Sequence, residues 1–224
     1  MPSLDTAALR RSAVVPPTRV DGLVGRAALL LAGALCAGAL AGTLWLRRPV
    51  APEPALVPFR VGALTIKVPQ AWLGPSMPRV GGATDALELK VPLAALLDPA
   101  PSAGDPLGRE ILHVAILPVE TGPSPAERAG TLYARFVAAA AVPVEGGLIR
   151  REFRPGTPFE GETFYVVPPD GRRFTARCAA PSEPAACLSE LRLSEIDLRV
   201  RFAPVLLAEW ERVVQGLAQS FGTR

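Results

Sequence analysis

The sequence of 224 residues predicts an α+β protein, in which a single N-terminal transmembrane helix precedes an antiparallel sheet of about eight strands packed with two helices. Three observations predict this fold class. Residues 27–46 carry no charge, residues 196–202 alternate strictly between apolar and polar side chains, and apolar residues recur at helical spacing over 206–221. These patterns are typical of a membrane span, a half-buried strand and an amphipathic helix, respectively.

The N-terminal quarter is expected to lack a folded domain. Residues 1–23 show no periodicity and predict a disordered cytoplasmic tail. Residues 24–48 predict the transmembrane helix, because their uncharged run of twenty residues would span roughly 30 Å. The proline-rich residues 49–57 predict a semi-rigid linker. Cleavage of the apolar segment as an export signal, near residues 39–41, is the alternative to a retained anchor.

The apolar segment also determines the expected location and two expected partners. A short tail inside and a large domain outside is the common arrangement, so we expect a single-pass protein of the inner membrane with a periplasmic C-terminal domain. The lipid bilayer is then one partner. Three small residues, Ala34, Gly38 and Gly42, are spaced four apart and would allow a homodimer through the transmembrane helix.

The domain expected at residues 58–222 begins with strands. Two short alternating runs, 58–61 and 64–68, flank Gly62 and Ala63 and predict a tight hairpin. Further strands are expected at 86–91, 110–118, 148–154, 161–167, 173–178, 187–193 and 196–202.

Two helices are expected to cover the apolar face of this sheet. Ser124, Pro125 and Glu127 form a capping-box pattern with proline at the first helical position, and an apolar face follows to about residue 140. The last helix is expected to begin at Pro204 and to end at Gly222.

Cys178 and Cys187 lie nine positions apart on either side of a loop rich in alanine and proline. Because Cys178 ends one expected strand and Cys187 begins the next, a hairpin would bring the two within disulfide reach. In an exported domain we therefore expect a structural disulfide that contributes about 2–3 kcal/mol. The alternatives are a reduced, inert pair and a metal or redox site, although a metal site would need further ligands and the chain has only one histidine.

The net charge of +3 does not indicate a nucleic-acid-binding protein. The positive excess flanks the apolar run, whereas residues 49–224 contain sixteen arginines and two lysines against nineteen acidic residues. Nucleic acid is therefore not an expected partner, and no cofactor is expected.

Arginines in the later strands form a candidate docking surface. If these strands are neighbours, several guanidinium groups share one solvent-exposed face and could bind an acidic envelope protein or an anionic envelope polymer. The candidates are Arg150, Arg173, Arg177, Arg199 and Arg201. The alternative is a set of cross-strand ion pairs with Glu152, Glu162, Glu190 and Asp197.

His113 is the one residue around which an enzyme could be built. A lone histidine in an alternating strand is usually a core or sheet-face residue, and a hydrolase would need a serine or carboxylate beside it. The sequence contains no Gly-x-Ser-x-Gly motif, phosphate-binding loop or metal-ligand helix. No catalytic residue and no metal ligand is therefore assigned.

Four stretches of the chain, 81–92, 133–137, 146–178 and 197–211, are together similar to uncharacterised single-pass membrane proteins of high-GC bacteria. The resemblance covers most of residues 59–221 and implies a shared domain, but no catalytic residue. The leading hypothesis is a non-enzymatic envelope protein whose exported domain binds another envelope component. The alternatives are an envelope hydrolase that uses His113 and a protein that signals across the membrane through residues 1–23.

Overall fold

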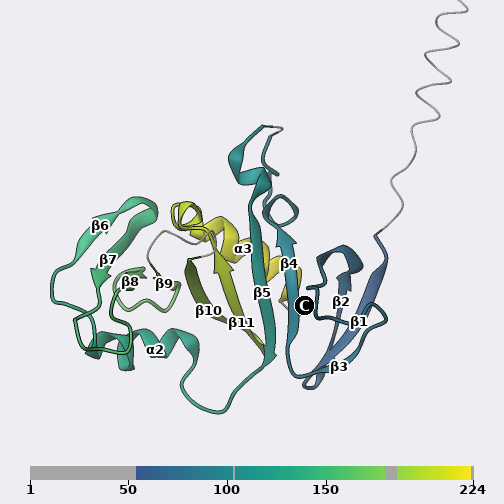
Figure 1. Ribbon diagram of the computed structural model, residues 1–224, viewed down its shortest axis with the longest axis horizontal. Helices are drawn as coiled ribbons and strands as arrows, with labels where there is room; N and C mark the ends of the chain where they lie inside the picture. Colours follow the sequence, from purple (N-terminus) through teal and green to yellow (C-terminus); the bar gives the residue numbers. More distant parts are fainter. Residues whose placement is uncertain (1–53, 103, 180–185, 223–224) are drawn as a thin grey trace, which may run out of the picture. The chain divides into compact units, whose positions relative to one another are not determined.

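The computed structural model describes residues 54–222, apart from residue 103 and residues 180–185. These residues form a three-stranded sheet, of order β2-β1-β3, and an eight-stranded sheet, of order β4-β5-β11-β10-β9-β8-β7-β6 (Figure 1). The smaller sheet comprises β1 (Leu56–Val61), β2 (Leu64–Pro69) and β3 (Gly82–Thr84). The larger comprises β4 (Leu87–Pro92), β5 (Ile111–Pro118), β6 (Val142–Val144), β7 (Leu148–Glu152), β8 (Thr163–Val166), β9 (Thr175–Cys178), β10 (Cys187–Leu193) and β11 (Ile196–Phe202).

The small sheet contains the predicted hairpin. β1 pairs with β2 in antiparallel register, and Gly62 takes the left-handed conformation (φ 58°) that the tight turn requires. β3 joins the other side of β1 in parallel. The alternation of β1 buries Val57, Phe59 and Val61 in the main core.

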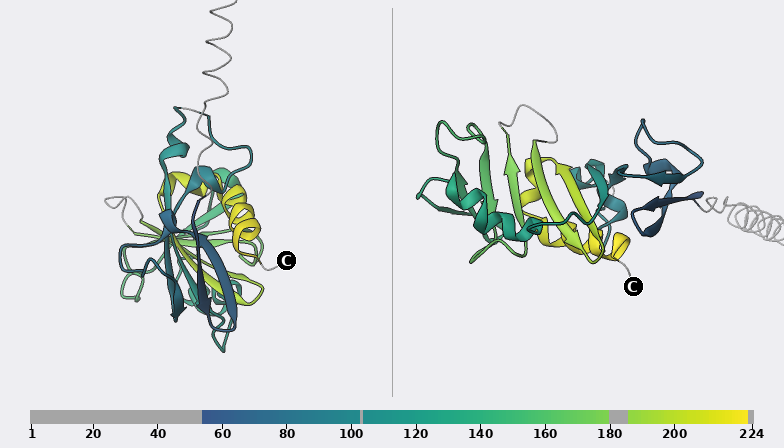
Figure 2. Two further views of the ribbon diagram at one scale, coloured as in Figure 1. Left: turned by 90° about the vertical axis from the view of Figure 1, so that its right-hand side faces the viewer. Right: turned by 90° about the horizontal axis from the view of Figure 1, so that it is seen from below.

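The large sheet is antiparallel throughout and packs one face on the helix α3 (Trp210–Phe221), as Figure 2 shows. The predicted alternation of β11 is confirmed, because Ile196, Leu198, Val200 and Phe202 are all buried. Gly216 allows α3 to approach the turn after β4 closely, since a Cβ at this position would lie 2.4 Å from the Leu96 carbonyl oxygen.

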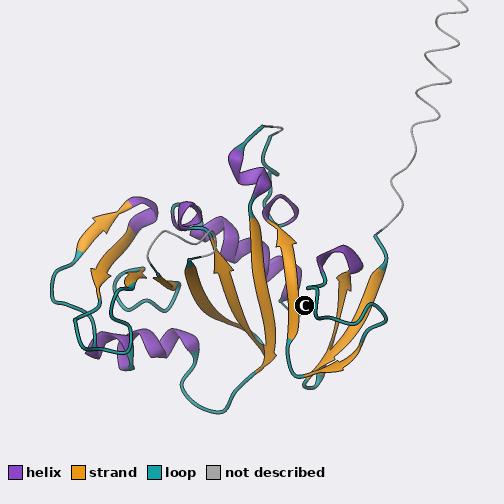
Figure 3. Ribbon diagram, in the orientation of Figure 1, coloured by secondary structure: helices purple, strands orange, loops and turns teal. Residues whose placement is uncertain are grey.

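The helix expected over 124–140 is shorter than predicted. α2 (Pro125–Thr131) begins with the predicted capping box of Ser124 and Glu127, but a 3-10 turn, η4 (Tyr133–Arg135), follows it (Figure 3). The chain then leaves the helix because Val137 forms a bridge with Phe153, and the Ala138 N–H donates to the Glu152 carbonyl. Tertiary packing has overridden helix propensity here.

These apolar side chains form a second cluster, which we call the aromatic cluster. Its buried members are Tyr133, Val137, Phe153 and Phe164, with Phe136, Phe159 and Val166 packed against them. Tyr133 and Phe159 meet edge to face at 5.3 Å between ring centroids, within the favoured range for aromatic pairs. Packing of the residues beyond 131 into this cluster explains why the helix is not longer.

The structure corrects the predicted fold class. Within the described ranges no helix is both long and apolar enough to cross a membrane. The longer of the two α-helices found there, α3, has 12 residues, or about 18 Å, and one of its faces is polar. The predicted antiparallel sheet of about eight strands is present, but among the described residues a second sheet of three strands accompanies it.

Several predictions concern segments outside the described residues. The tail at 1–23, the span at 24–48 and the small residues Ala34, Gly38 and Gly42 all belong to these segments. Most of the predicted linker does too, although β1 already begins at Leu56 within it.

Candidate functional site

The face of the large sheet opposite α3, which we call the outer face, is covered over only part of its width. α2 and the aromatic cluster lie over the outer face of β8, β9, β10 and the start of β11 at Asp197, a region we call the covered half. The outer face of β4, β5 and the later part of β11, at Arg199 and Arg201, has no such layer among the described residues, and we call it the open half. The charged side chains of the two halves have very different surroundings.

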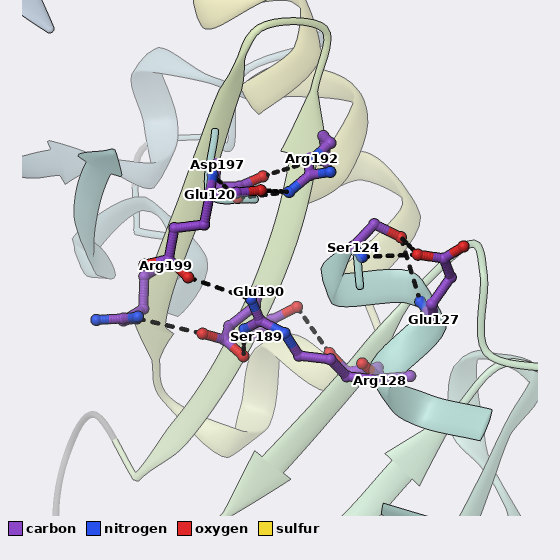
Figure 4. Close-up of polar contacts among 10 residues, drawn as sticks. Glu120, Ser124, Glu127, Arg128, Ser189, Glu190, Arg192, Asp197 and Arg199 are labelled. Carbon is purple, nitrogen blue, oxygen red and sulfur yellow. Dashed lines mark hydrogen bonds and ion pairs between the residues drawn. The ribbon is translucent and has the colours of Figure 1, made fainter. Parts of the chain in front are cut away.

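In the covered half, acidic residues join α2 to the sheet. Arg128 of α2 donates to Glu190 of β10 at 3.1 Å and pairs with Glu120 at 3.6 Å (Figure 4). Glu190 also accepts a hydrogen bond from Arg199 of β11 at 3.3 Å. One carboxylate therefore connects a helix and two adjacent strands.

Asp197 of β11 is the most buried charge of this network, with only 6% of the residue exposed. The Arg192 guanidinium donates hydrogen bonds to both oxygens of its carboxylate, at 2.7 and 2.8 Å. This bidentate geometry makes such pairs strong. Burial acts to raise the pKa of Asp197. The hydrogen bonds and charge of Arg192, helped by the Glu120 N–H, outweigh burial and hold this pKa below its usual value.

Arg177 of β9 is also enclosed in the covered half. It donates to Glu162 at 2.7 Å, and its guanidinium lies over the rings of Tyr133 and Phe159, at 5.4 and 4.7 Å from their centroids. Only 19% of its side chain is exposed. Arg177 is therefore a structural link between the sheet and the aromatic cluster.

The open half carries a shallow hollow of about 410 Å³. Its polar lining comes from three adjacent strands, with Glu88 and Lys90 from β4, His113 from β5, and Arg199 and Arg201 from β11. Gly74 and Pro75 also belong to the lining, and Ala115 of the middle strand, β5, contributes a small side chain. The hollow therefore contains three cationic side chains and one histidine, together with a single acidic group.

The strand register places three of these basic groups in one row, which we call the basic row. Lys90 is opposite His113, and His113 is opposite Arg201. All three are exposed, and neither Lys90 nor Arg201 has an ion pair with another described residue. Glu88, the nearest acidic group of the lining, instead accepts a hydrogen bond from Ser76 at 2.8 Å. The basic row thus forms no ion pair within the described part of the domain, although Glu88 lies one step away along β4.

The five arginines proposed as a docking surface do not form a single surface. Arg177, Arg199 and Arg201 belong to the outer face, whereas Arg150 is in register with Ala176, which is buried on the α3 side. Arg173 also lies on that side, where it pairs with Glu211 of α3 at 2.7 Å and stacks over Trp210 at 5.1 Å. Of the five, Arg201 and the half-exposed Arg199 line the hollow.

Lys90 and His113 join this surface although the sequence did not single them out for it. A signal was present, because both occupy polar positions in alternating apolar strands. What the sequence lacked was the pairing that places β4 and β5 beside β11. Long-range strand order cannot be read from alternation alone.

The predicted disulfide is confirmed. Cys178 and Cys187 are bonded and lie opposite each other in register, with their Cα atoms 3.9 Å apart. The next pair outward exchanges a backbone hydrogen bond, from Ala179 N–H to the Ala186 carbonyl, so the cysteines occupy a non-hydrogen-bonded position, where strands approach closely.

The described residues show few of the side-chain arrangements that are typical of an active site. His113 makes no hydrogen bond there to a hydroxyl or carboxylate, and the hollow has no serine, threonine or cysteine in its lining. Nor do the same residues contain a group of three or more His, Cys, Asp or Glu side chains that could hold a metal ion.

Comparison with known proteins finds no matching family model and no matching curated protein. Among solved structures, Smlt3025, an immunity protein of the Stenotrophomonas maltophilia type IV secretion system, aligns with a TM-score of 0.48 and 13% identity over 75% of this chain and 91% of its own. The iron-regulated outer membrane lipoprotein FrpD of Neisseria meningitidis aligns with a TM-score of 0.39 and 13% identity, over 74% and 92%. Both scores are below 0.5, so nothing about this chain follows from them. The resemblance to single-pass membrane proteins stays a prediction.

Proposed function

We propose that this protein is a non-enzymatic binding protein of the bacterial envelope, and that the open half of the large sheet binds an acidic partner protein. The observation that carries the proposal is the basic row. Lys90, His113 and Arg201 lie side by side on an exposed sheet face, and its two cations, Lys90 and Arg201, have no ion pair among the described residues. An acidic partner would supply the counter-charge that these two cations lack within the described residues.

The contrast with four arginines elsewhere in the domain supports this choice of surface. Arg128, Arg173, Arg177 and Arg192 each have an acidic partner within the domain at 3.1 Å or less. Ion pairing within the domain therefore accounts for those residues without a second protein. It does not account for Lys90 and Arg201.

The disulfide supports the envelope as the location. Disulfides persist in oxidising compartments such as the periplasm and are rare in the cytosol. The bond between Cys178 and Cys187 joins strands of the same sheet that carries the basic row, so both features would belong to the exported domain.

Photo-crosslinking in cells that naturally express the chain tests the proposal. A photoreactive amino acid at Ala115, inside the hollow, should give a discrete adduct that protease removes. The same amino acid at the exposed Val205, outside the hollow, is the control and should give none.

The adduct at position 115 should also disappear in the double variant Lys90→Ala/Arg201→Ala. It should persist in Arg150→Ala/Arg172→Ala, which removes the same charge from side chains that have acidic partners. A protease-resistant smear would indicate an anionic polymer instead of a protein. That result, or equal crosslinking at positions 115 and 205, would overturn the proposal.

A further inference from the structure

From the geometry of the open half we infer that the partner presents an acidic α-helix, and that this helix lies across strands β4, β5 and β11 rather than along them. The inference rests on the proposed function, since it concerns the same surface, and adds the form and orientation of the partner. It depends on spacing, on the shape of the hollow and on the position of its one acidic residue.

Spacing is the first line of support. Neighbouring strands are about 4.8 Å apart, so the basic row from Lys90 through His113 to Arg201 extends about 10 Å across the sheet. On a helix, residues i, i+4 and i+7 lie on one face, and the first and last are separated by about 10.5 Å. On an extended strand, three successive residues of one face cover about 13 Å. A helix therefore matches the row better than a strand.

The shape of the hollow is the second line of support. One step along the strands from the basic row, the side chains in register are Glu88, Ala115 and Arg199. Ala115 is the smallest of these, and it leaves a depression between two charged neighbours. A helix lying over the basic row could place an apolar side chain over Ala115 while its acidic face meets the row.

Glu88 is the third line of support, because it makes the surface asymmetric. The β4 end of the second row is negative at Glu88, whereas the β11 end is positive at Arg199. Arg199 already pairs with Glu190 at 3.3 Å, so the basic row remains the main attraction. A lysine or arginine of the partner near Glu88 would fix which way the helix runs.

The inference is tested with three synthetic peptides and the full-length chain. The first is a helical peptide with glutamates at i, i+4 and i+7. The second has the same composition with its glutamates distributed around the helix, and the third is the first peptide with a central proline that breaks the helix. Fluorescence anisotropy at low salt measures the affinity of each, because exposed charge pairs are screened at higher ionic strength.

We expect the first peptide to bind about tenfold more tightly than either of the others, a difference of about 1.4 kcal/mol. The double variant Lys90→Ala/Arg201→Ala should remove that preference, whereas Arg150→Ala/Arg172→Ala should keep it. Equal binding of all three peptides, lost in the first double variant, would overturn the helix and leave the acidic-partner proposal standing. Binding that both double variants retain in full would overturn both.

Discussion

Arg177 and Arg201 lie on the same row of the large sheet, separated only by Leu188, yet their surroundings are opposite. Arg177 is largely buried, paired with Glu162 and enclosed by two aromatic rings. Arg201 is exposed, has no ion pair among the described residues and lines a hollow beside Lys90 and His113. The residue type and the sheet are the same. The layer above the sheet makes the difference, because α2 and the aromatic cluster cover one arginine and not the other.

This comparison suggests that the covered half contributes to stability and the open half to binding. Variants in the covered half should then change the free energy of unfolding and leave acidic-peptide affinity intact. Variants in the open half should do the reverse. The predictions below test that division, from the largest effect on stability to the smallest.

Removing the disulfide should have the largest effect. β9 pairs with β10 over two residues, whereas β10 pairs with β11 over seven. The bond between Cys178 and Cys187 therefore reinforces the shortest strand pairing of the large sheet. We expect Cys178→Ala/Cys187→Ala to lower the free energy of unfolding by about 2–3 kcal/mol. Urea denaturation measures the loss. Added reductant should destabilise the wild type and leave the double variant unchanged, and an unchanged midpoint in the variant would contradict the assignment.

Arg177→Ala should destabilise the domain by about 2 kcal/mol. The substitution leaves Glu162 without its cation and removes the stacking on Tyr133 and Phe159. Chemical denaturation gives the value, and Arg172→Ala, at an exposed arginine of the neighbouring turn, is the control. Affinity for the acidic helical peptide should be unaffected, so a peptide-binding defect in a folded Arg177→Ala variant would count against the division.

Asp197 should make stability depend on acid pH. Its pKa is lowered in the folded state from an ordinary value of 3.8, so its contribution is complete above about pH 4 and is lost as the pH falls through the folded-state pKa. Asp197→Asn should lower the free energy of unfolding by about 1.5 kcal/mol at pH 7. It should also make the further loss of stability below pH 4 smaller than in the wild type. Thermal unfolding between pH 2 and 7 tests this. An acid dependence as steep in the variant as in the wild type would show that another carboxylate is responsible.

Lys90→Ala and Arg201→Ala should have the smallest effects on stability, each within about 0.5 kcal/mol of the wild type. Neither side chain has an ion partner to lose within the described residues. Urea denaturation of the two single variants provides the measurement. A loss above about 1 kcal/mol in either would place the open half among the structural parts of the domain.

Local patterns predicted several features because a few neighbouring residues determine them. The alternation of β11, the hairpin around Gly62, the capping box of Ser124 and the pairing of Cys178 with Cys187 are of this kind. Each depends on chain neighbours or on adjacent strands. The structure retains all four.

Features that depend on distant contacts were not predictable. The first helix ends early because Val137 pairs with Phe153, and the β1–β2 hairpin forms a separate sheet because β3 pairs with β1. The division of the arginines between two faces has the same cause. In the sequence, Arg177 and Arg201 both occupy polar positions of predicted strands. Only the placement of the aromatic cluster gives them different surroundings.

The central claim is that an acidic helix binds over β4, β5 and β11. Its most direct test is the backbone-amide NMR spectrum of the nitrogen-15-labelled full-length chain, titrated with the peptide carrying glutamates at i, i+4 and i+7. Shift changes should be concentrated at residues 88–90 and 113–115 and at Arg199 and Arg201, which line the hollow. Changes concentrated instead around Arg173 and α3, or spread evenly over exposed arginines, would contradict the claim.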